Sequence, residues 1–324
     1  MIGYIIRRLL GIIPLLLGIT IISFAIIHLA PGKPTTQQEL MSPRISYEAR
    51  VRLERLYDLD KPLHIQYIKW ISRIVRLDLG TSIVDGRAVV DKIIERIPVT
   101  LTINVLALIL ILLVSIPLGI KAAGKPGSLF DKITTVAVFV GFALPAFWVA
   151  LLLMQLFSIK LGWFPISGIK SLDFEYFSWP KKILDLAHHL VLPVFVSAIG
   201  GLAGFSRYIR QNMVHALSQP FIITAKAKGL SQRQILYRHA FPNAILPLIT
   251  ILGLSVPGLL GGSIIFESIF ALPGLGQLFY TAVMMRDYNL IMASVVLGAV
   301  LTMLGNLAAD IAYAYADPRI RYKK

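Results

Sequence analysis

Residue patterns that usually carry enzymatic chemistry are missing from this sequence. Two Gly-Lys pairs, Gly32-Lys33 and Gly124-Lys125, could belong to a phosphate-binding loop, but Pro follows each of them where such a loop has Ser or Thr. The chain also lacks the H-E-x-x-H pattern of a zinc helix and the G-x-S-x-G turn of a serine hydrolase. We therefore predict no catalytic residue and no nucleotide site or bound cofactor in this chain.

The adjacent histidines His188 and His189 are the best candidates for metal ligands. Direct neighbours point in different directions on a helix, because residues share a face only three or four positions apart. We interpret them as histidines at a membrane interface and predict no metal site. The chain has no cysteine, so thiolate metal sites and disulfides are excluded.

Asp310 is the one acidic residue continuous with a long apolar block, and it follows Asn306 by four residues. Ion-coupled carriers keep charged groups within their spans, although each costs about 2.5–3.5 kcal/mol at the bilayer centre. No such group lies near the centre of an apolar block here. We expect Asn306 and Asp310 to have a structural or gating role, with a proton relay as the less favoured alternative.

Long uncharged blocks dominate the chain, which has 324 residues, 56% of them hydrophobic and 15% charged. Crossing a hydrocarbon core of roughly 30 Å takes about 20 helical residues. The first block should remain as an anchor, since its apolar run exceeds the about 7–15 residues of a signal peptide. We predict an all-α membrane protein with six transmembrane helices, in 1–29, 97–120, 133–159, 186–206, 243–266 and 288–312.

The distribution of Lys and Arg predicts the orientation. With the N-terminus inside, the inner segments hold 15 basic and three acidic residues, whereas the two short outer loops hold five of each. Basic residues accumulate in short cytoplasmic loops, so we expect both termini, including the tail 316–324, to be cytoplasmic. This asymmetry explains most of the net charge of +15 without a nucleic-acid partner.

Residues 30–96 form a long predicted outer segment with helical patterns of its own. Charged and spaced apolar residues alternate over 46–57, and apolar residues recur at helical spacing over 65–75 until Asp78 and Gly80. We predict a small helical extracytoplasmic region that lies on the membrane or against the bundle. A surface that docks a partner is an equal alternative.

The predicted inner segment 207–242 carries a helix–turn–helix pattern. Ala225, Ala227 and Gly229 suggest a short helix with small side chains that fits into a groove, and Gly229 suits its left-handed end. Ser231 is the expected cap of a second helix that reaches about Ala240. Docking to DNA is improbable, because membrane spans flank the segment on both sides.

An outer element is predicted between the last two spans. Glu267 ends an apolar run, and Pro273-Gly274 forces a turn before Leu275 and Gly276. The apolar residues that follow could dip back into the membrane surface. We predict a re-entrant or interfacial element here.

Several segments of the sequence resemble a known family. Ala-x-Ala-x-Gly at 225–229, with Pro242 thirteen residues after the glycine, resembles the cytoplasmic loop signature of binding-protein-dependent ABC transporter permeases. The short N-terminus is similar to that of the first of two permeases in the dipeptide, oligopeptide and nickel branch. Ile223 stands where the loop signature often has Glu, and Lys33 where an acid is common. Further segments that resemble this branch are RRLLGIIPLLLGITIISFAIIHLAPGKP (7–34), DLGTS (78–82), LGWFPISG (161–168), ESIFALPGLGQL (267–278) and DPRIRY (317–322).

The resemblance implies a permease subunit of an ATP-driven importer, a multi-pass protein of the cytoplasmic (inner) membrane. Its implied partners are a second related permease, two ABC ATPase subunits that use ATP and Mg, membrane lipid and an extracytoplasmic binding protein. Di- and oligopeptides are the expected substrates, with nickel or an oligosaccharide as the alternative. A stand-alone channel, a secondary carrier and an intramembrane enzyme are the alternatives from other classes.

The resemblance also implies two groups of site residues. One would couple to the ATPase through a short helix inserted into a cleft of that subunit, and one would form an outer gate that receives substrate. The coupling residues are Thr224, Ala225, Lys226, Ala227, Lys228 and Gly229. The outer-gate residues are Glu267, Pro273, Gly274, Leu275 and Gly276.

Overall fold

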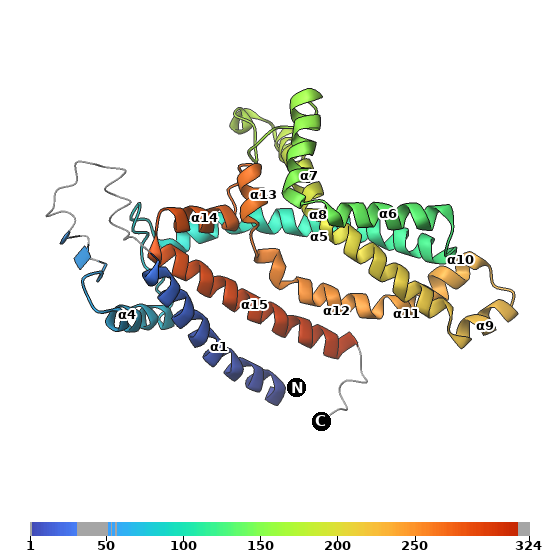
Figure 1. Ribbon diagram of the computed structural model, residues 1–324, viewed down its shortest axis with the longest axis horizontal. Coiled ribbons are helices and arrows are strands. Elements are labelled where there is room, and N and C mark those ends of the chain that lie inside the picture. Colours follow the sequence, from blue (N-terminus) through green and yellow to red (C-terminus); the bar gives the residue numbers. More distant parts are fainter. Residues whose placement is uncertain (1, 31–50, 53, 56, 317–324) are drawn as a thin grey trace. The chain divides into compact units, whose positions relative to one another are not determined.

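The computed structural model describes residues 2–30, 51–52, 54–55 and 57–316, and it is built from helices (Figure 1). In these ranges no β-strand occurs beyond an isolated bridge between Thr81 and Ala88. The predicted all-α class is therefore confirmed. The elements are α1 (Ile2–Leu29), α4 (Leu63–Val75), α5 (Val89–Gly124), α6 (Leu129–Ala143), α7 (Ala146–Leu153), η1 (Met154–Lys160), η2 (Phe174–Tyr176), α8 (Trp179–Leu217), α9 (Pro220–Ala227), α10 (Gln232–Gln234), η3 (Ile235–Ala240), α11 (Phe241–Ala244), α12 (Leu246–Ser255), η4 (Pro257–Leu260), α13 (Ile264–Ile269), α14 (Leu275–Met284) and α15 (Tyr288–Ala316).

Four helices are long and apolar enough to cross a membrane, namely α1, α5, α8 and α15. A fifth span would combine α6 with the continuous stretch formed by α7 and η1. These two parts are bent by 100° relative to each other. The bend lies at Leu144 and Pro145, because the residue before a proline is driven out of the helical conformation. Over the described ranges, length and composition thus support four or five spans rather than the predicted six.

The predicted span 243–266 is wrong as one continuous helix. Its residues are divided among α11, α12, η4 and the start of α13, and residues 261–263 are not helical. Pro247 lies in the first turn of α12 and Pro257 begins η4. Proline removes a helical hydrogen bond and clashes with the preceding turn, so these two residues account for the breaks before α12 and η4.

Two predicted spans are longer in the structure than in the sequence prediction. The helix α5 begins before residue 97 and ends after residue 120, and α8 extends beyond 186–206 at both ends. The predicted spans were limited to uncharged residues, whereas helical hydrogen bonding does not depend on side-chain charge, so α5 continues through Lys121 and α8 through Arg210.

The described chain divides into two compact units, and the first contains the predicted outer region. It comprises Met1–Thr100, Leu260–Ile264 and Pro273–Leu307. Within it, Trp70 of α4 is buried in a cluster with Phe24 and Met292, and the hydroxyls of Thr20 and Tyr67 lie 2.9 Å apart. The predicted helix at 65–75 is confirmed and packs against other helices. The prediction at 46–57 lies largely outside the described residues.

A buried aspartate joins the segment before α5 to the turn before α15. The Ser82 hydroxyl donates to Asp287 Oδ2 at 2.5 Å, and the Ile83 amide donates to Asp287 Oδ1 at 3.1 Å. Lys92 reaches the Ser82 hydroxyl at 3.2 Å and the Asp85 carboxylate at 2.7 Å. Partial burial opposes ionisation of Asp85, but the hydrogen bonds from Lys92 and Ser82 prevail and lower its pKa. The segment that resembles the family at 78–82 thus anchors this junction.

The second unit comprises Leu101–Leu259, Ile265–Leu272 and Ala308–Lys324. In it, α6 and α7 both pack against α8. Its main core joins the C-terminal part of α5 to the C-terminal part of α8 and to the residues that follow α8, as far as α12. This core supports the segment predicted to couple to an ATPase.

Candidate functional site

The candidate coupling segment is α9 together with the turn that follows it. Ile222 is 1% exposed and Ala225 4% exposed, and the two lie three positions apart on one helical face. Both belong to the core cluster that contains Ile120 of α5 and Met213 of α8. The buried face of α9 therefore shares one core with two helices that are long enough to cross a membrane.

Gly229 ends α9 in the left-handed conformation, as predicted, with a φ of +74°. The Gly229 amide donates to the Lys226 carbonyl at 2.9 Å, and the Leu230 amide donates to the Ala225 carbonyl at 3.3 Å. These are the two hydrogen bonds of a Schellman motif. Leu230 also packs against the core cluster, so the chain direction after the helix is firmly set.

The predicted cap of the next helix is confirmed at Ser231. Its side chain accepts from the Gln234 amide, and the Gln234 side chain accepts from the Ser231 amide, which is a capping box. The helical stretch continues through η3 to Ala240. Gln232 then ties this stretch to the end of α5 through a 3.0 Å bond to the Gly124 carbonyl.

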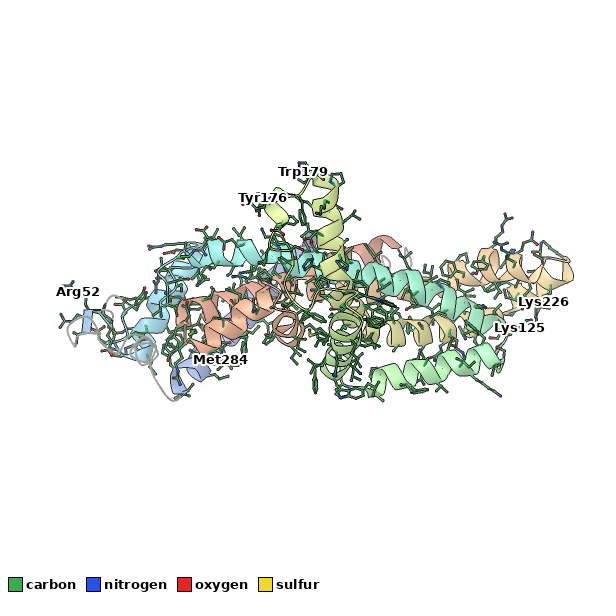
Figure 2. The ribbon with its side chains drawn as sticks, turned by 90° about the horizontal axis from the view of Figure 1, so that it is seen from above. Arg52, Lys125, Tyr176, Trp179, Lys226 and Met284 are labelled. Carbon is green, nitrogen blue, oxygen red and sulfur yellow. The ribbon has the colours of Figure 1, made fainter. Side chains whose placement is uncertain are left out.

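The opposite face of α9 is exposed and partly apolar. Ile223 is 68% exposed and Phe221 39% exposed. Figure 2 shows Lys226 and Lys125 at the same end of the second unit, and the described side chains include no acid paired with either. Large apolar side chains that stay exposed among polar residues mark a candidate site of protein interaction.

This arrangement changes the expected role of one predicted residue and adds two others. Ala225 cannot enter a groove of a partner, because its side chain is buried in the core of this chain. Thr224, Lys226, Ala227, Lys228 and Gly229 are exposed. The sequence prediction noted Ile223 only as a departure from a motif and overlooked Phe221. The available signal was a pair of large apolar residues in a segment predicted to face water.

An ion pair fixes the start of α6 to α8, close to the coupling segment. Arg210 donates through Nε to Asp131 Oδ1 at 2.5 Å and through Nη2 to Asp131 Oδ2 at 2.7 Å. The Gly127 amide adds a third hydrogen bond to Asp131 Oδ2 at 2.9 Å. The Asp131 side chain is only 5% exposed. The sequence prediction counted both residues as loop charges and did not foresee their pairing.

The segment predicted to form the outer gate has two parts that belong to different units. In the second unit, Glu267 is buried in α13, and its carbonyl accepts from the Leu272 amide at 2.7 Å. Ala271 adopts a φ of +48° at the end of this helix. The Gly168 amide donates to the Phe270 carbonyl at 2.8 Å. This hydrogen bond therefore connects two segments that resemble the family, 161–168 and 267–278.

In the first unit, Gly274 precedes α14 as its N-cap, after Pro273. The Leu275 amide donates to the Thr100 hydroxyl at 2.8 Å. A Cβ on Gly276 would lie 2.7 Å from the backbone of Ser263 and Ile264, so only glycine permits this approach. The helix α14 has 10 residues and is too short to cross a bilayer.

The remaining polar candidates have hydrogen-bond partners or have side chains outside the described part of the chain. Asn306 is half-buried in α15, while the side chain of Asp310 is outside the described part, so their pairing stays a prediction. A ring nitrogen of His188 lies 2.6 Å from the Trp163 carbonyl oxygen, and Nδ1 of His189 lies 2.8 Å from the Asp185 carbonyl oxygen. Among the side chains that the structure describes, no three His, Asp or Glu residues are grouped to hold a metal ion.

Comparison with known proteins agrees with this architecture. The family described as "Binding-protein-dependent transport system inner membrane component" matches residues 115–322. The related description "Binding-prot-dependent transport system membrane comp, N-term" matches residues 1–104. Together the two matches cover nearly the whole chain.

Individual relatives match over their full lengths. The oligopeptide transport system permease protein AppB of Bacillus subtilis is 46% identical over 323 residues, which cover 99% of this chain and 100% of AppB. The di/tripeptide transport system permease protein DppB of Pseudomonas aeruginosa is 35% identical over 342 residues, with 100% of both chains covered. The glutathione transport system permease protein GsiC of Salmonella typhimurium is 35% identical over 323 residues, again with full coverage of both. These matches confirm the resemblance, and the chain belongs to the family of binding-protein-dependent transport system inner membrane components, as a multi-pass protein of the inner membrane.

Proposed function

We propose that the chain is one of two permease subunits of an ATP-driven importer that carries di- and oligopeptides. The relatives named for oligopeptide, di/tripeptide and glutathione transport support this substrate class. A second, related permease would complete the pathway, and an extracytoplasmic binding protein would deliver the peptide. Two ABC ATPase subunits would bind and hydrolyse ATP with Mg.

The exposed face of α9 carries the proposal for coupling. An ATPase subunit would contact Ile223, Phe221 and the exposed residues from Thr224 to Gly229. The opposite face, with Ile222 and Ala225, is part of the core shared with α5 and α8. Movement of the ATPase would shift α9, and the shared core would move the membrane helices with it. Such coupling requires two states with different contacts, which ATP binding and release would supply.

The proposal includes the six-span arrangement with both termini in the cytoplasm. In that arrangement the broken segment from α11 to η4 crosses the membrane as an interrupted helix. Membrane proteins tolerate such breaks where the freed backbone groups face protein or a water-filled pathway. The hydrogen bonds from Asn104 to the Leu259 carbonyl at 2.8 Å and to the Gly258 carbonyl at 3.5 Å satisfy two such groups.

The test uses the transporter purified with its natural partners. Ile223→Asp should reduce co-purification of the ATPase at least about tenfold, since an interface anchor contributes about 2 kcal/mol or more. It should also abolish ATP-dependent uptake of a labelled dipeptide into proteoliposomes. Ile68→Asp is a matched control, because Ile68 of α4 is 60% exposed but lies in the first unit. This control should retain the ATPase.

Three results would contradict the proposal at different points. Normal ATPase association in Ile223→Asp, together with normal uptake, would remove α9 as the coupling segment. Dipeptide uptake without ATP would instead indicate a secondary carrier. Uptake of Ni²⁺ or an oligosaccharide with no uptake of peptides would leave the coupling intact and change only the substrate.

A further inference from the structure

A groove lies between α5, α6 and α8 in the second unit. Its volume is about 390 Å³. Eleven of its sixteen lining residues are apolar or glycine, so it is suited to a hydrocarbon chain rather than to a polar solute. Small residues are frequent in its lining, namely Gly119, Ala122, Ala137, Gly141 and Ala203.

The polar residues of this groove are gathered at one end. Thr134 and Thr135 lie early in α6, and Ser206, Arg207 and Arg210 lie late in α8. The apolar part reaches back along α8 to Ile199, which is about 17 Å from Arg210 at a helical rise of about 1.5 Å per residue. A molecule that fits this shape has a polar group joined to an apolar tail.

Most of the polar groups at that end already form hydrogen bonds or an ion pair within this chain. Arg210 is held by Asp131 in the ion pair described above. The Thr134 hydroxyl donates to the Phe130 carbonyl at 2.8 Å, and the Thr135 hydroxyl donates to the Asp131 carbonyl at 2.7 Å. The two threonine hydroxyls therefore already donate their protons within α6, and Asp131 balances the charge of Arg210.

Arg207 is different, because it supplies a positive charge without an acidic partner among the side chains that the structure describes. Its guanidinium lies 4.9 Å from the centre of the Phe139 ring, which also lines the groove. A guanidinium is planar and holds its N–H donors in one plane, where two of them match two oxygens of a phosphate. The groove thus combines an apolar hollow with one uncompensated cation at its polar end.

We propose that this groove binds an anionic phospholipid, with the phosphate on Arg207 and an acyl chain between α5, α6 and α8. A peptide would leave most of its backbone groups without partners in such a lining. A helix of another subunit would leave Arg207 without an anion unless it also supplied an acid. Basic pockets between membrane helices are known to suit acidic lipid headgroups.

The test measures lipid bound to the whole transporter in nanodiscs of phosphatidylcholine with or without phosphatidylglycerol. Native mass spectrometry should find phosphatidylglycerol retained on the wild-type complex in preference to phosphatidylcholine. Arg207→Gln should reduce that retention about fivefold, which corresponds to one basic residue near an anionic membrane surface. Arg207→Lys should restore part of it. An excess of inorganic phosphate should not displace the lipid, because phosphate cannot fill the apolar groove.

Lys132→Gln is the matched control, because Lys132 is an exposed residue of α6 near the same end and does not line the groove. It should leave retention unchanged. Gly141→Leu should fill the groove and also reduce retention, since a Cβ there meets only the Ile199 side chain, at 3.8 Å.

Equal losses in Lys132→Gln and Arg207→Gln would overturn the proposal in favour of general surface attraction. Displacement by phosphate would overturn it in favour of a free-anion site. A photoreactive residue at Val138 that labels the second permease instead of lipid would overturn it in favour of a subunit interface.

Discussion

At the scale of single residues, the ion pair Asp131–Arg210 joins a buried carboxylate of α6 to a partly exposed guanidinium of α8. It links two residues 79 positions apart and uses both guanidinium nitrogens that face the carboxylate. A carboxylate at 5% exposure can stay charged only where such partners replace its water. The pair therefore holds the start of α6 on α8, next to the coupling segment.

Asp131→Asn should be strongly destabilising, because it leaves the Arg210 guanidinium without its counter-charge. Removal of one partner from a buried pair costs about 3–5 kcal/mol, and we expect the lower end because Arg210 is partly exposed. The measurement is the melting temperature of the purified complex. Arg210→Gln added to Asp131→Asn should cost less than the sum of the two single changes.

The control for this prediction is an exposed ion pair. Lys170→Gln breaks the pair between Lys170 and Glu175, which is 2.6 Å long and largely exposed on both sides. Exposed pairs contribute about 0–1 kcal/mol, so the melting temperature should hardly change. Similar small shifts in Asp131→Asn and Lys170→Gln would show that the buried pair has no structural importance.

At the scale of elements, the close approach of α14 to residues 262–264 depends on one glycine. The ideal Cβ of Gly276 would lie within 3.0 Å of backbone atoms of Gly262, Ser263 and Ile264. Backbone atoms cannot rotate away as a side chain can, so α14 itself would have to move. Because Leu275 bonds to Thr100 of α5, that movement would also disturb α5.

Gly276→Ala should therefore destabilise the first unit by about 1–3 kcal/mol, the usual cost of overpacking. Gly298→Ala is the control, because Gly298 lies within α15 and a Cβ there meets nothing within 4 Å. Alanine favours a helix interior by about 1 kcal/mol over glycine. Thermal unfolding of the complex should thus shift in opposite directions for the two variants. A shift to higher temperature in Gly276→Ala would contradict the close packing.

At the scale of the whole molecule, the segments of the chain differ in how they can cross the membrane. Helices α1, α5, α8 and α15 are long enough to cross unaided, whereas the segments 129–160 and 241–260 are bent or broken. The charge distribution favours a crossing by each of them. Since the sequence contains no cysteine, single introduced cysteines can report each side of the membrane.

Cysteines at Lys125 and Lys228 should react with a membrane-impermeant maleimide only from the cytoplasmic side, and cysteines at Tyr176 and Met284 only from the outside. All four positions are exposed. The broken segment lies between Lys228 and Met284, so opposite reactivity of these two requires it to cross the membrane. The measurement compares labelling in right-side-out and inverted vesicles. Labelling of Lys228→Cys and Met284→Cys from the same side would refute the six-span arrangement.

The local features of this protein were determined by the sequence alone. Helices at α1, α5, α8 and α15, the left-handed end at Gly229 and the cap at Ser231 all follow from patterns within a few neighbouring residues. The family resemblance rested on short motifs of the same kind. Such features depend on backbone sterics, capping and the length of apolar runs, which the neighbouring residues specify.

Only the tertiary structure decided which faces are buried and which distant residues meet. It buried Ala225 and exposed Ile223, it paired Asp131 with Arg210, and it left a groove beside Arg207. A small residue in a short helix suits either a partner or the core of its own chain, because both environments are apolar. The choice depends on packing with helices far away in the sequence, and periodicity along the chain cannot specify that packing.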